Sequence, residues 1–162
     1  MKAETRLFGK IDIADDRIIT LKEGIIGFPE LQKFALIHDE EKKEKGKIMW
    51  LQSMDDTAFA MPVMNPLEVI PRYHPTISED KYKILGKLSP EDIFVLVTIT
   101  VPKNIQNMSV NLKAPFIINM NNLQGAQIIV EDDYPVKYMI YELLKKQKNA
   151  EGEKAGDQVC SH

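Results

Sequence analysis

Short runs of apolar and β-branched residues, each ended by a turn signal, recur along most of this chain. The predicted strands are RLFGKIDI (6–13), RIITL (17–21), KFALIHD (33–39), KIMWLQS (47–53), TAFAMPVM (57–64), DIFVLVTITV (92–101), MSVNLKAPFIINM (108–120) and QGAQIIVE (124–131). About eight short strands at such spacing are typical of a small barrel or sandwich. We therefore expect a mainly β protein, a small antiparallel β-barrel-like or curled sandwich domain.

The residues within and between these runs predict how the strands are arranged. Asp15 and Asp16 suit a turn that joins the first two runs in a hairpin. Pro62 has no amide hydrogen to donate to a ladder, so its strand is expected at a sheet edge or bent at that residue. The longest apolar run, 92–101, is expected to be the central strand.

Two helices are expected besides the strands. Ser78 can cap a short helix near 78–86, and Gly86 suits its C-terminal exit. From Pro135 onward, apolar residues recur at three- and four-residue spacing, which predicts an amphipathic C-terminal helix. Three prolines within 65–77 favour an extended excursion over the surface.

The length of 162 residues suits one domain. We expect 1–149 to form that domain, C-terminal helix included, and 150–162 to be a disordered tail because it has no hydrophobic periodicity. No apolar run reaches the roughly 20 residues of a membrane span. The charged start, MKAETRLFGK, lacks the apolar stretch of a signal peptide. These features predict a cytoplasmic protein.

Charge and cysteine content argue against several kinds of site. The net charge of −3 disfavours non-specific nucleic-acid binding. The basic run KKEKGK (42–47) is interrupted by a glutamate, as expected of a solvated hairpin tip. The single cysteine, Cys160, can form neither an internal disulfide nor a cysteine-based zinc site.

The remaining polar residues do not predict catalysis. His38, His74 and His162 lack metal-ligand spacing. The acidic pairs at 15–16, 55–56 and 132–133 flank predicted strands, where aspartate serves turns, and adjacent carboxylates on a strand point to opposite faces. We therefore expect a protein that is not an enzyme and that uses no metal and no cofactor.

The stretch EGIIGFPEL (23–31) raises the possibility of a phosphate-binding loop. It contains two glycines, but no Lys-Ser or Lys-Thr follows and a proline stands where helical amides should point at the anion. A turn between strands fits better, with freedom from Gly24 and Gly27 and a constrained exit at Pro29. Phe28 is the apolar residue of this turn that could face outward.

Three stretches, taken in order, resemble the flagellar assembly factor family FliW. They are LKEGIIGFPELQKFALI (21–37), MWLQSMDDTAFAMPVMNP (49–66) and VNLKAPFIINMNNLQGAQIIVEDDYPV (110–136). The resemblance extends from Leu7 to about Tyr138. It implies a compact β-barrel-like fold and a non-enzymatic role.

What the resemblance further implies is a switch between two protein partners. Members of this family bind CsrA, a small dimeric regulator that represses translation of flagellin mRNA, and they also bind the C-terminal region of flagellin. Free flagellin occupies the family member and CsrA is released to repress translation. We expect this chain to have the same two partners, to bind neither nucleic acid nor membrane directly, and to be monomeric when free.

Seven residues are candidates for the partner contacts. A mildly acidic face would suit CsrA, which must be basic where it holds RNA, and three carboxylates are proposed for it. The apolar neighbours of Trp50 favour a place in the buried core, and the alternative is an interface anchor, a role in which tryptophan is enriched. Asn111 and Lys113 could bond across an interface, and an asparagine there could equally satisfy its own loop. The full set is Phe28, Trp50, Asp55, Asp56, Glu68, Asn111 and Lys113.

Three further alternatives stay open. Met54, Met61 and Met64 could line an adaptable groove or merely fill a core. An RNA-binding β-barrel would need a basic strand face with interleaved aromatics, which the acidic balance and the 7% aromatic content disfavour. A small hydrolase would need a cleft with a strongly perturbed titratable group.

Overall fold

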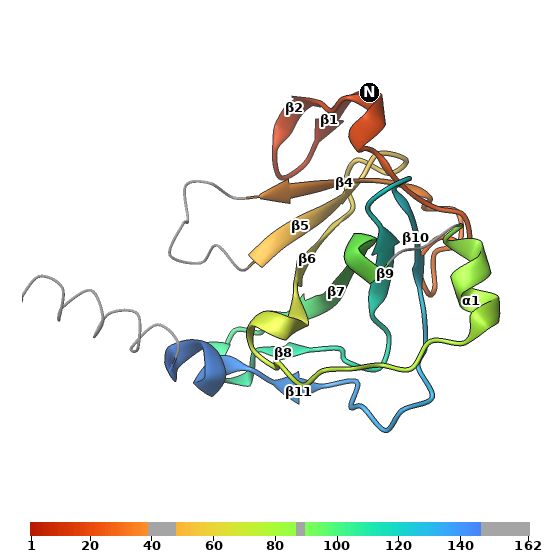
Figure 1. Ribbon diagram of the computed structural model, residues 1–162. Helices are drawn as coiled ribbons and strands as arrows, with labels where there is room; N and C mark the ends of the chain where they lie inside the picture. The colour runs from red at the N-terminus through yellow and green to blue at the C-terminus, as the bar shows by residue number, and fades with distance from the viewer. Residues whose placement is uncertain (39–47, 87–89, 147–162) are drawn as a thin grey trace, which may run out of the picture.

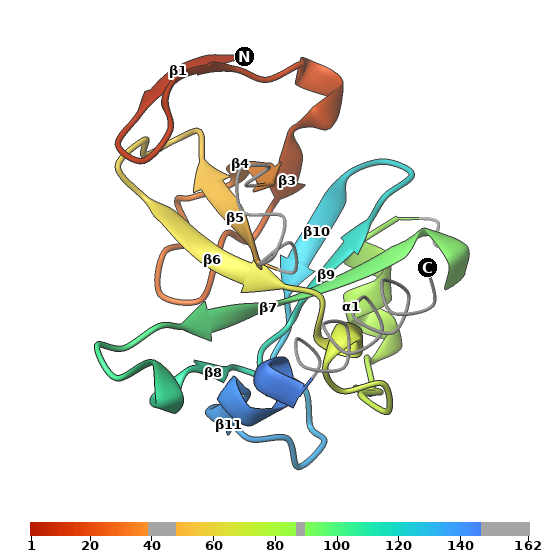
Figure 2. The same ribbon diagram turned by 90° about the vertical axis from the view of Figure 1, so that its left-hand side faces the viewer.

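The computed structural model describes residues 1–38, 48–86 and 90–146, and Figures 1 and 2 show it from two directions. The strands are β1 (Lys2–Thr5), β2 (Gly9–Asp12), β3 (Ile19–Leu21), β4 (Lys33–His38), β5 (Ile48–Ser53), β6 (Ala60–Met64), β7 (Ile93–Thr100), β8 (Ser109–Val110), β9 (Phe116–Asn119), β10 (Gln124–Gln127) and β11 (Tyr138–Met139). The helices are α1 (Glu79–Ile84), a helix at 141–146, and the short 3₁₀ turns η1 (Asp15–Arg17), η3 (Pro66–Glu68), η4 (Pro90–Asp92) and η5 (Ile105–Asn107).

Seven of these strands close into a barrel. Their order is β7, β6, β5, β4, β3, β10 and β9, and β9 pairs back with β7. Every neighbouring pair is antiparallel except β3 and β10, which run parallel. The expectation of a small, mainly antiparallel barrel is therefore confirmed, with one parallel pair that the sequence did not predict.

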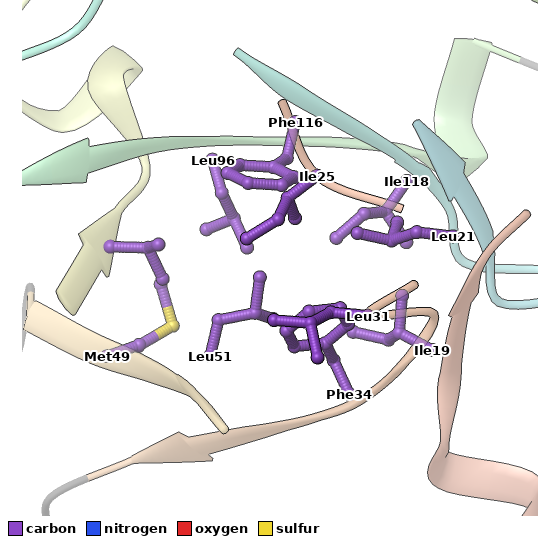
Figure 3. Close-up of a cluster of buried hydrophobic side chains, with 11 residues drawn as sticks. Ile19, Leu21, Ile25, Leu31, Phe34, Met49, Leu51, Leu96, Phe116 and Ile118 are labelled. Carbon is purple, nitrogen blue, oxygen red and sulfur yellow. The ribbon is translucent and has the colours of Figure 1, made fainter. Parts of the chain in front are cut away.

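The barrel is filled by side chains that alternate along its strands, because successive side chains of a strand point to opposite faces. Met49 and Leu51 of β5 point inward, and their neighbours Trp50 and Gln52 point outward. Figure 3 shows the interior. The buried members of this cluster are Ile19, Leu21, Ile25, Leu31, Phe34, Met49, Leu51, Val63, Leu96, Phe116 and Ile118.

Two further hydrophobic clusters cover parts of the barrel's outside. One buries Met64 and Val97 beneath segment 66–73, β8, β11 and the 141–146 helix, which contributes Leu143 and Leu144. The other buries Ile117 against Leu85, at the end of α1. The long excursion at 65–77 is therefore partly core, contrary to the expectation of a surface segment, because Val69 and Tyr73 are buried.

The N-terminal hairpin differs from the predicted one. β1 pairs with β2 in a separate two-stranded sheet, and its turn is at 6–8. The Thr5 hydroxyl donates to the Gly9 carbonyl and accepts from the Phe8 amide, and Gly9 has a φ of +65°. The acidic pair instead begins η1, which leads into β3.

The strands that contain the Pro62, 92–101 and 108–120 runs can be compared with their predicted arrangement. The strand of Pro62 is β6, which lies between β5 and β7 rather than at an edge, but its pairing with β7 is limited to Val63 and Met64. The run 92–101 is central, since β7 pairs with β6, β8 and β9. The run 108–120 is divided into β8 and β9, with the register against β7 shifted by three residues between them.

The two expected helices are present with adjusted ends. α1 follows Ser78 as its N-cap, although the Ser78 side chain makes no capping hydrogen bond, and Gly86 leaves the helix with a φ of +79°. The C-terminal helix begins at Tyr141 rather than at Pro135. The intervening residues Tyr138 and Met139 pair with β8 instead. The KKEKGK run and the tail at 150–162 lie outside the described residues.

Candidate partner-binding surfaces

One end of the barrel brings Phe28, Asp55 and Asp56 together. Phe28 lies in the β3–β4 connection, and its ring centroid is 5.6 Å from that of Phe59 in the β5–β6 connection. These two connections meet because the start of β4 lies beside the end of β5 in their antiparallel pair. Ile26, from the first connection, lies at the same end. We call Ile26, Phe28, Asp55, Asp56 and Phe59 the barrel-end surface.

The turn that presents Phe28 depends on its glycines. Gly24 and Gly27 have φ values of +69° and +91°, and Ile25 forms a bridge with Phe28. A Cβ atom on Gly24 would lie 2.5 Å from the Pro29 backbone, whereas one on Gly27 would meet nothing within 4 Å. Ile25 is buried and anchors the turn, which leaves Phe28 46% exposed.

Asp55 and Asp56 are exposed but held in place by backbone groups. The Asp55 Oδ2 atom accepts from the amides of Gln32 and Lys33 at 2.7 and 2.8 Å. The Asp56 Oδ1 atom accepts from the Ala58 amide at 3.2 Å. Both carboxylates are therefore fixed at the barrel end and remain open to solvent. Such a site can attract a basic group without first ordering its own side chains.

Two members of this surface were not predicted from the sequence. Ile26 is 51% exposed, and its amide donates to the Gln127 side chain of β10 at 2.8 Å. Phe59 is half-buried and packs against both the barrel core and Phe28. The pairing of β4 with β5 brings the connection that carries Ile26 beside the aspartates. Phe59 follows Asp56 in the β5–β6 connection, and its amide donates to the Asp56 carbonyl at 2.9 Å. Runs such as GIIGF and TAFAM do not by themselves indicate which apolar side chains face outward.

Glu68, the third residue proposed for an acidic face, lies elsewhere. Asp56 precedes β6 and Glu68 follows it, in η3, so the two residues are at opposite ends of a five-residue strand. At roughly 3.3 Å per residue, that strand separates them by about 16 Å. The carboxylate of Glu68 is therefore not part of the barrel-end surface, and its role in binding stays a prediction.

Trp50 points away from the barrel interior. It is half-buried, and its ring makes an edge-on contact with Phe8 of the N-terminal hairpin, with centroids 6.2 Å apart. Trp50 is therefore neither part of the barrel core nor part of the barrel-end surface.

Among the methionines, Met54 and Met64 are buried, and Met61 is partly buried against the barrel core. These three fill core space rather than line a groove.

Asn111 and Lys113 lie in the bulge between β8 and β9, and both bond within the chain. The Asn111 Oδ1 atom accepts from the amides of Lys113 and Ala114 at 3.0 and 3.1 Å. The Lys113 ammonium donates to the Asp132 carbonyl at 2.7 Å. This geometry matches the alternative in which the asparagine satisfies its own loop. Contacts of these residues with a partner stay a prediction.

Asp132 fastens the 65–77 excursion to this bulge. Its two carboxylate oxygens accept from the Thr76 amide at 2.7 Å and from the Thr76 hydroxyl at 2.9 Å. Nearby, the buried Tyr73 hydroxyl donates to the Leu112 carbonyl at 2.7 Å, and burial raises the pKa of Tyr73 above its ordinary range. The hydroxyl therefore stays protonated and remains a donor at neutral pH.

The hydrogen bonds to Asp132 predict that this residue makes the stability of the fold depend on pH in the acid range. Hydrogen bonding from Thr76, first from its amide, lowers the pKa of Asp132 below its ordinary value. The stabilisation is therefore present above the unfolded-state pKa of about 3.9 and is lost as pH falls through the lower folded-state pKa. Asp132→Asn should be less stable than wild type at neutral pH, with the difference shrinking below pH ~4.

Urea unfolding followed by circular dichroism between pH 7 and pH 2.5 measures this difference. The matched control is Asp133→Asn, at the exposed neighbouring position. A difference between wild type and Asp132→Asn that stays constant across this pH range would contradict the role assigned to the carboxylate.

The described residues hold no group of three or more His, Cys, Asp or Glu side chains placed to bind a metal ion. His38 is exposed at the end of β4. His74 is also exposed, and its backbone amide donates to the Tyr134 hydroxyl at 3.0 Å. His162 and Cys160 lie outside the described residues. Within the described chain, no helix has the length and apolar character needed to span a membrane.

Comparison with known proteins places this barrel in a family. The family described as FliW protein matches residues 2–140. A flagellar assembly factor FliW of Lachnospira eligens is 41% identical over 92% of this chain and all of its own length. That of Lachnoclostridium phytofermentans is 39% identical over 94% of this chain and 99% of its own.

A solved structure gives the same result for the fold. The crystal structure of a flagellar assembly factor FliW superimposes with a TM-score of 0.79 at 26% identity. The match covers 87% of this chain and 97% of that one. With the family match extending over most of the sequence and the barrel shared, this chain belongs to the FliW family of flagellar assembly factors.

Proposed function

We propose that this chain is a non-enzymatic partner switch that binds the translational regulator CsrA and flagellin in turn. When CsrA is bound here, its repression of flagellin mRNA is relieved. When free flagellin occupies the chain, CsrA is released. In this account the protein works in the cytoplasm as one domain, residues 1–149, that is monomeric when free and needs no cofactor.

The observation that best supports this proposal is the composition of the barrel-end surface. Ile26 and Phe28 expose apolar area beside the two fixed carboxylates of Asp55 and Asp56. A protein that holds RNA must be basic where it meets phosphate. An acidic, partly apolar surface therefore suits CsrA as a partner, with the carboxylates steering association and the apolar side chains supplying burial.

Removing the barrel-end charge should weaken the complex with CsrA. The double variant Asp55→Asn/Asp56→Asn keeps oxygen acceptors for the amides that bond these side chains, so it tests charge with little structural change. We expect about a three- to tenfold loss of affinity at low salt, shrinking as salt rises because exposed charges are screened. Isothermal titration calorimetry at two salt concentrations measures both effects.

The control is Asp12→Asn/Asp16→Asn, which removes the same charge from exposed positions in and after the N-terminal hairpin. It should bind CsrA as wild type does. Equal affinities for wild type and the barrel-end variant at low salt would contradict the proposed acidic contact. A gel shift in which this chain alone retains RNA would favour the RNA-binding alternative instead.

A further inference from the structure

An apolar row crosses the outside of the barrel at Trp50. Ile37 of β4 pairs with Trp50 of β5, and Trp50 pairs with Pro62 of β6, so the three side chains share one face of the sheet. All three are half-buried, as is Phe8, which meets Trp50 edge-on from the hairpin. We call Phe8, Ile37, Trp50 and Pro62 the Trp50 wall.

Other parts of the barrel's outer surface are covered by elements of the same chain. The outer faces of β7, β9 and β10 are covered by α1, the 65–77 excursion and the C-terminal elements. The neighbouring cross-strand pair on the same face, Ala35 of β4 and Gln52 of β5, is also shielded from solvent, since these residues are 1% and 0% exposed. The N-terminal hairpin forms no strand pairing with the barrel and touches the wall through Phe8. Figure 2 shows β5 and β6 with the hairpin beside their connection.

One cation, Arg6, lies between Phe8 of this wall and the β5–β6 connection. Arg6 lies in the hairpin turn, and its amide and Nε donate to the carbonyls of Thr57 and Ala58. In the described ranges, the structure records no carboxylate within ion-pairing distance of the Arg6 guanidinium. Leu7, between Arg6 and Phe8, is 43% exposed. The edge of the wall nearest the β5–β6 connection therefore offers apolar area beside a positive charge.

We propose that the Trp50 wall is a second docking surface, which takes an amphipathic protein segment with apolar side chains and a flanking carboxylate for Arg6. The charge argument separates the partners: a basic protein suits the carboxylates of the barrel end, and an acidic or neutral apolar segment suits the wall. The inference rests on the proposed function, in which the segment belongs to flagellin and CsrA meets the barrel end.

Both surfaces share one short connection. Residues 54–59 carry Asp55 and Asp56 at the barrel end, and the carbonyls of Thr57 and Ala58 hold the hairpin that carries Arg6 and Phe8. The Gln52 amide group also donates to the carbonyls of Ser53, Thr57 and Phe59. A partner that moves the hairpin at the wall therefore acts on the segment that fixes the barrel-end carboxylates, so exchange does not require overlapping surfaces.

Trp50 is the only tryptophan of the chain, so its fluorescence reports on the wall directly. Titration with flagellin from the same organism should shift Trp50 emission to shorter wavelength as the ring is buried, and titration with CsrA should leave the emission unchanged. Arg6→Glu should weaken flagellin binding about tenfold and CsrA binding less than twofold. Arg72→Glu, the same change at another exposed position, should alter neither.

Trp50→Phe keeps an aromatic ring and should retain flagellin binding, measured by calorimetry, while the fluorescence signal is lost. The proposal is overturned if flagellin binds without changing Trp50 emission, or if Arg6→Glu and Arg72→Glu bind it equally well. It is also overturned if wild type does not bind flagellin. In that case the flagellin part of the proposed function fails with it. If flagellin binds and releases CsrA but Trp50 emission and the Arg6→Glu variant do not respond, only the assignment of the wall is wrong.

Discussion

Gly24→Ala should destabilise the protein by about 3 kcal/mol or more, because two separate costs add at this position. An alanine at a φ of +69° carries backbone strain of about 1–2 kcal/mol. Its Cβ would also lie 2.5 Å from the Cα and carbonyl oxygen of Pro29, so the loop must move. For a chain of this length the melting temperature should fall by about 6–12 °C.

Gly27→Ala is the matched control within the same turn. Gly27 has a φ of +91° with open space around it, so the variant carries the strain without the clash. We expect about 1–2 kcal/mol for Gly27→Ala. Urea unfolding of both variants, monitored by circular dichroism, isolates the clash as their difference. Equal destabilisation would show that the close approach of Gly24 to Pro29 does not hold this turn.

Phe34→Ala should remove about 3–5 kcal/mol of stability, the usual cost of deleting a buried phenylalanine ring. Phe34 is fully buried in the barrel, opposite Ile19 of β3 and Ser53 of β5. A loss of this size approaches the whole stability of a typical domain, so Phe34→Leu is measured beside it, with an expected loss of about 1–1.5 kcal/mol.

Phe28→Ala makes the same truncation at the barrel end and should lose only about 1 kcal/mol, most of it from the ring contact with Phe59. Chemical unfolding of Phe34→Ala, Phe34→Leu and Phe28→Ala measures the stability that each variant loses. If Phe28→Ala were as destabilising as Phe34→Ala, Phe28 would be a core residue and not part of an exposed surface.

The strand pattern allowed much of the barrel to be predicted, and non-local pairing explains most of the rest. Alternation in β5 indicates two faces, with Met49 and Leu51 on one and Trp50 on the other, but it does not say which face closes the barrel. The parallel pairing of β3 with β10 joins segments about 100 residues apart and leaves no local signal. The N-terminal hairpin was misplaced because Asp15 and Asp16 suit a turn as well as Thr5 and Gly9 do.

The candidate surfaces show the same limit. Phe28 and Asp55 are neighbours because β4 and β5 form an antiparallel pair. Their proximity can therefore be predicted only once that strand pair is predicted. That Glu68 lies at the other end of β6 follows in the same way. The internal bonds of Asn111 and Lys113 could not be predicted, because they depend on a bulge and on Asp132, which is distant in sequence.

Exchange of partners on the purified protein tests the proposed switch. A complex of this chain with CsrA is isolated by size-exclusion chromatography and then challenged with flagellin. The proposed switch predicts that the first complex forms and that flagellin releases CsrA from it. A chain that binds neither protein, or that keeps CsrA bound at saturating flagellin, would contradict the switch while leaving the fold and the family assignment intact.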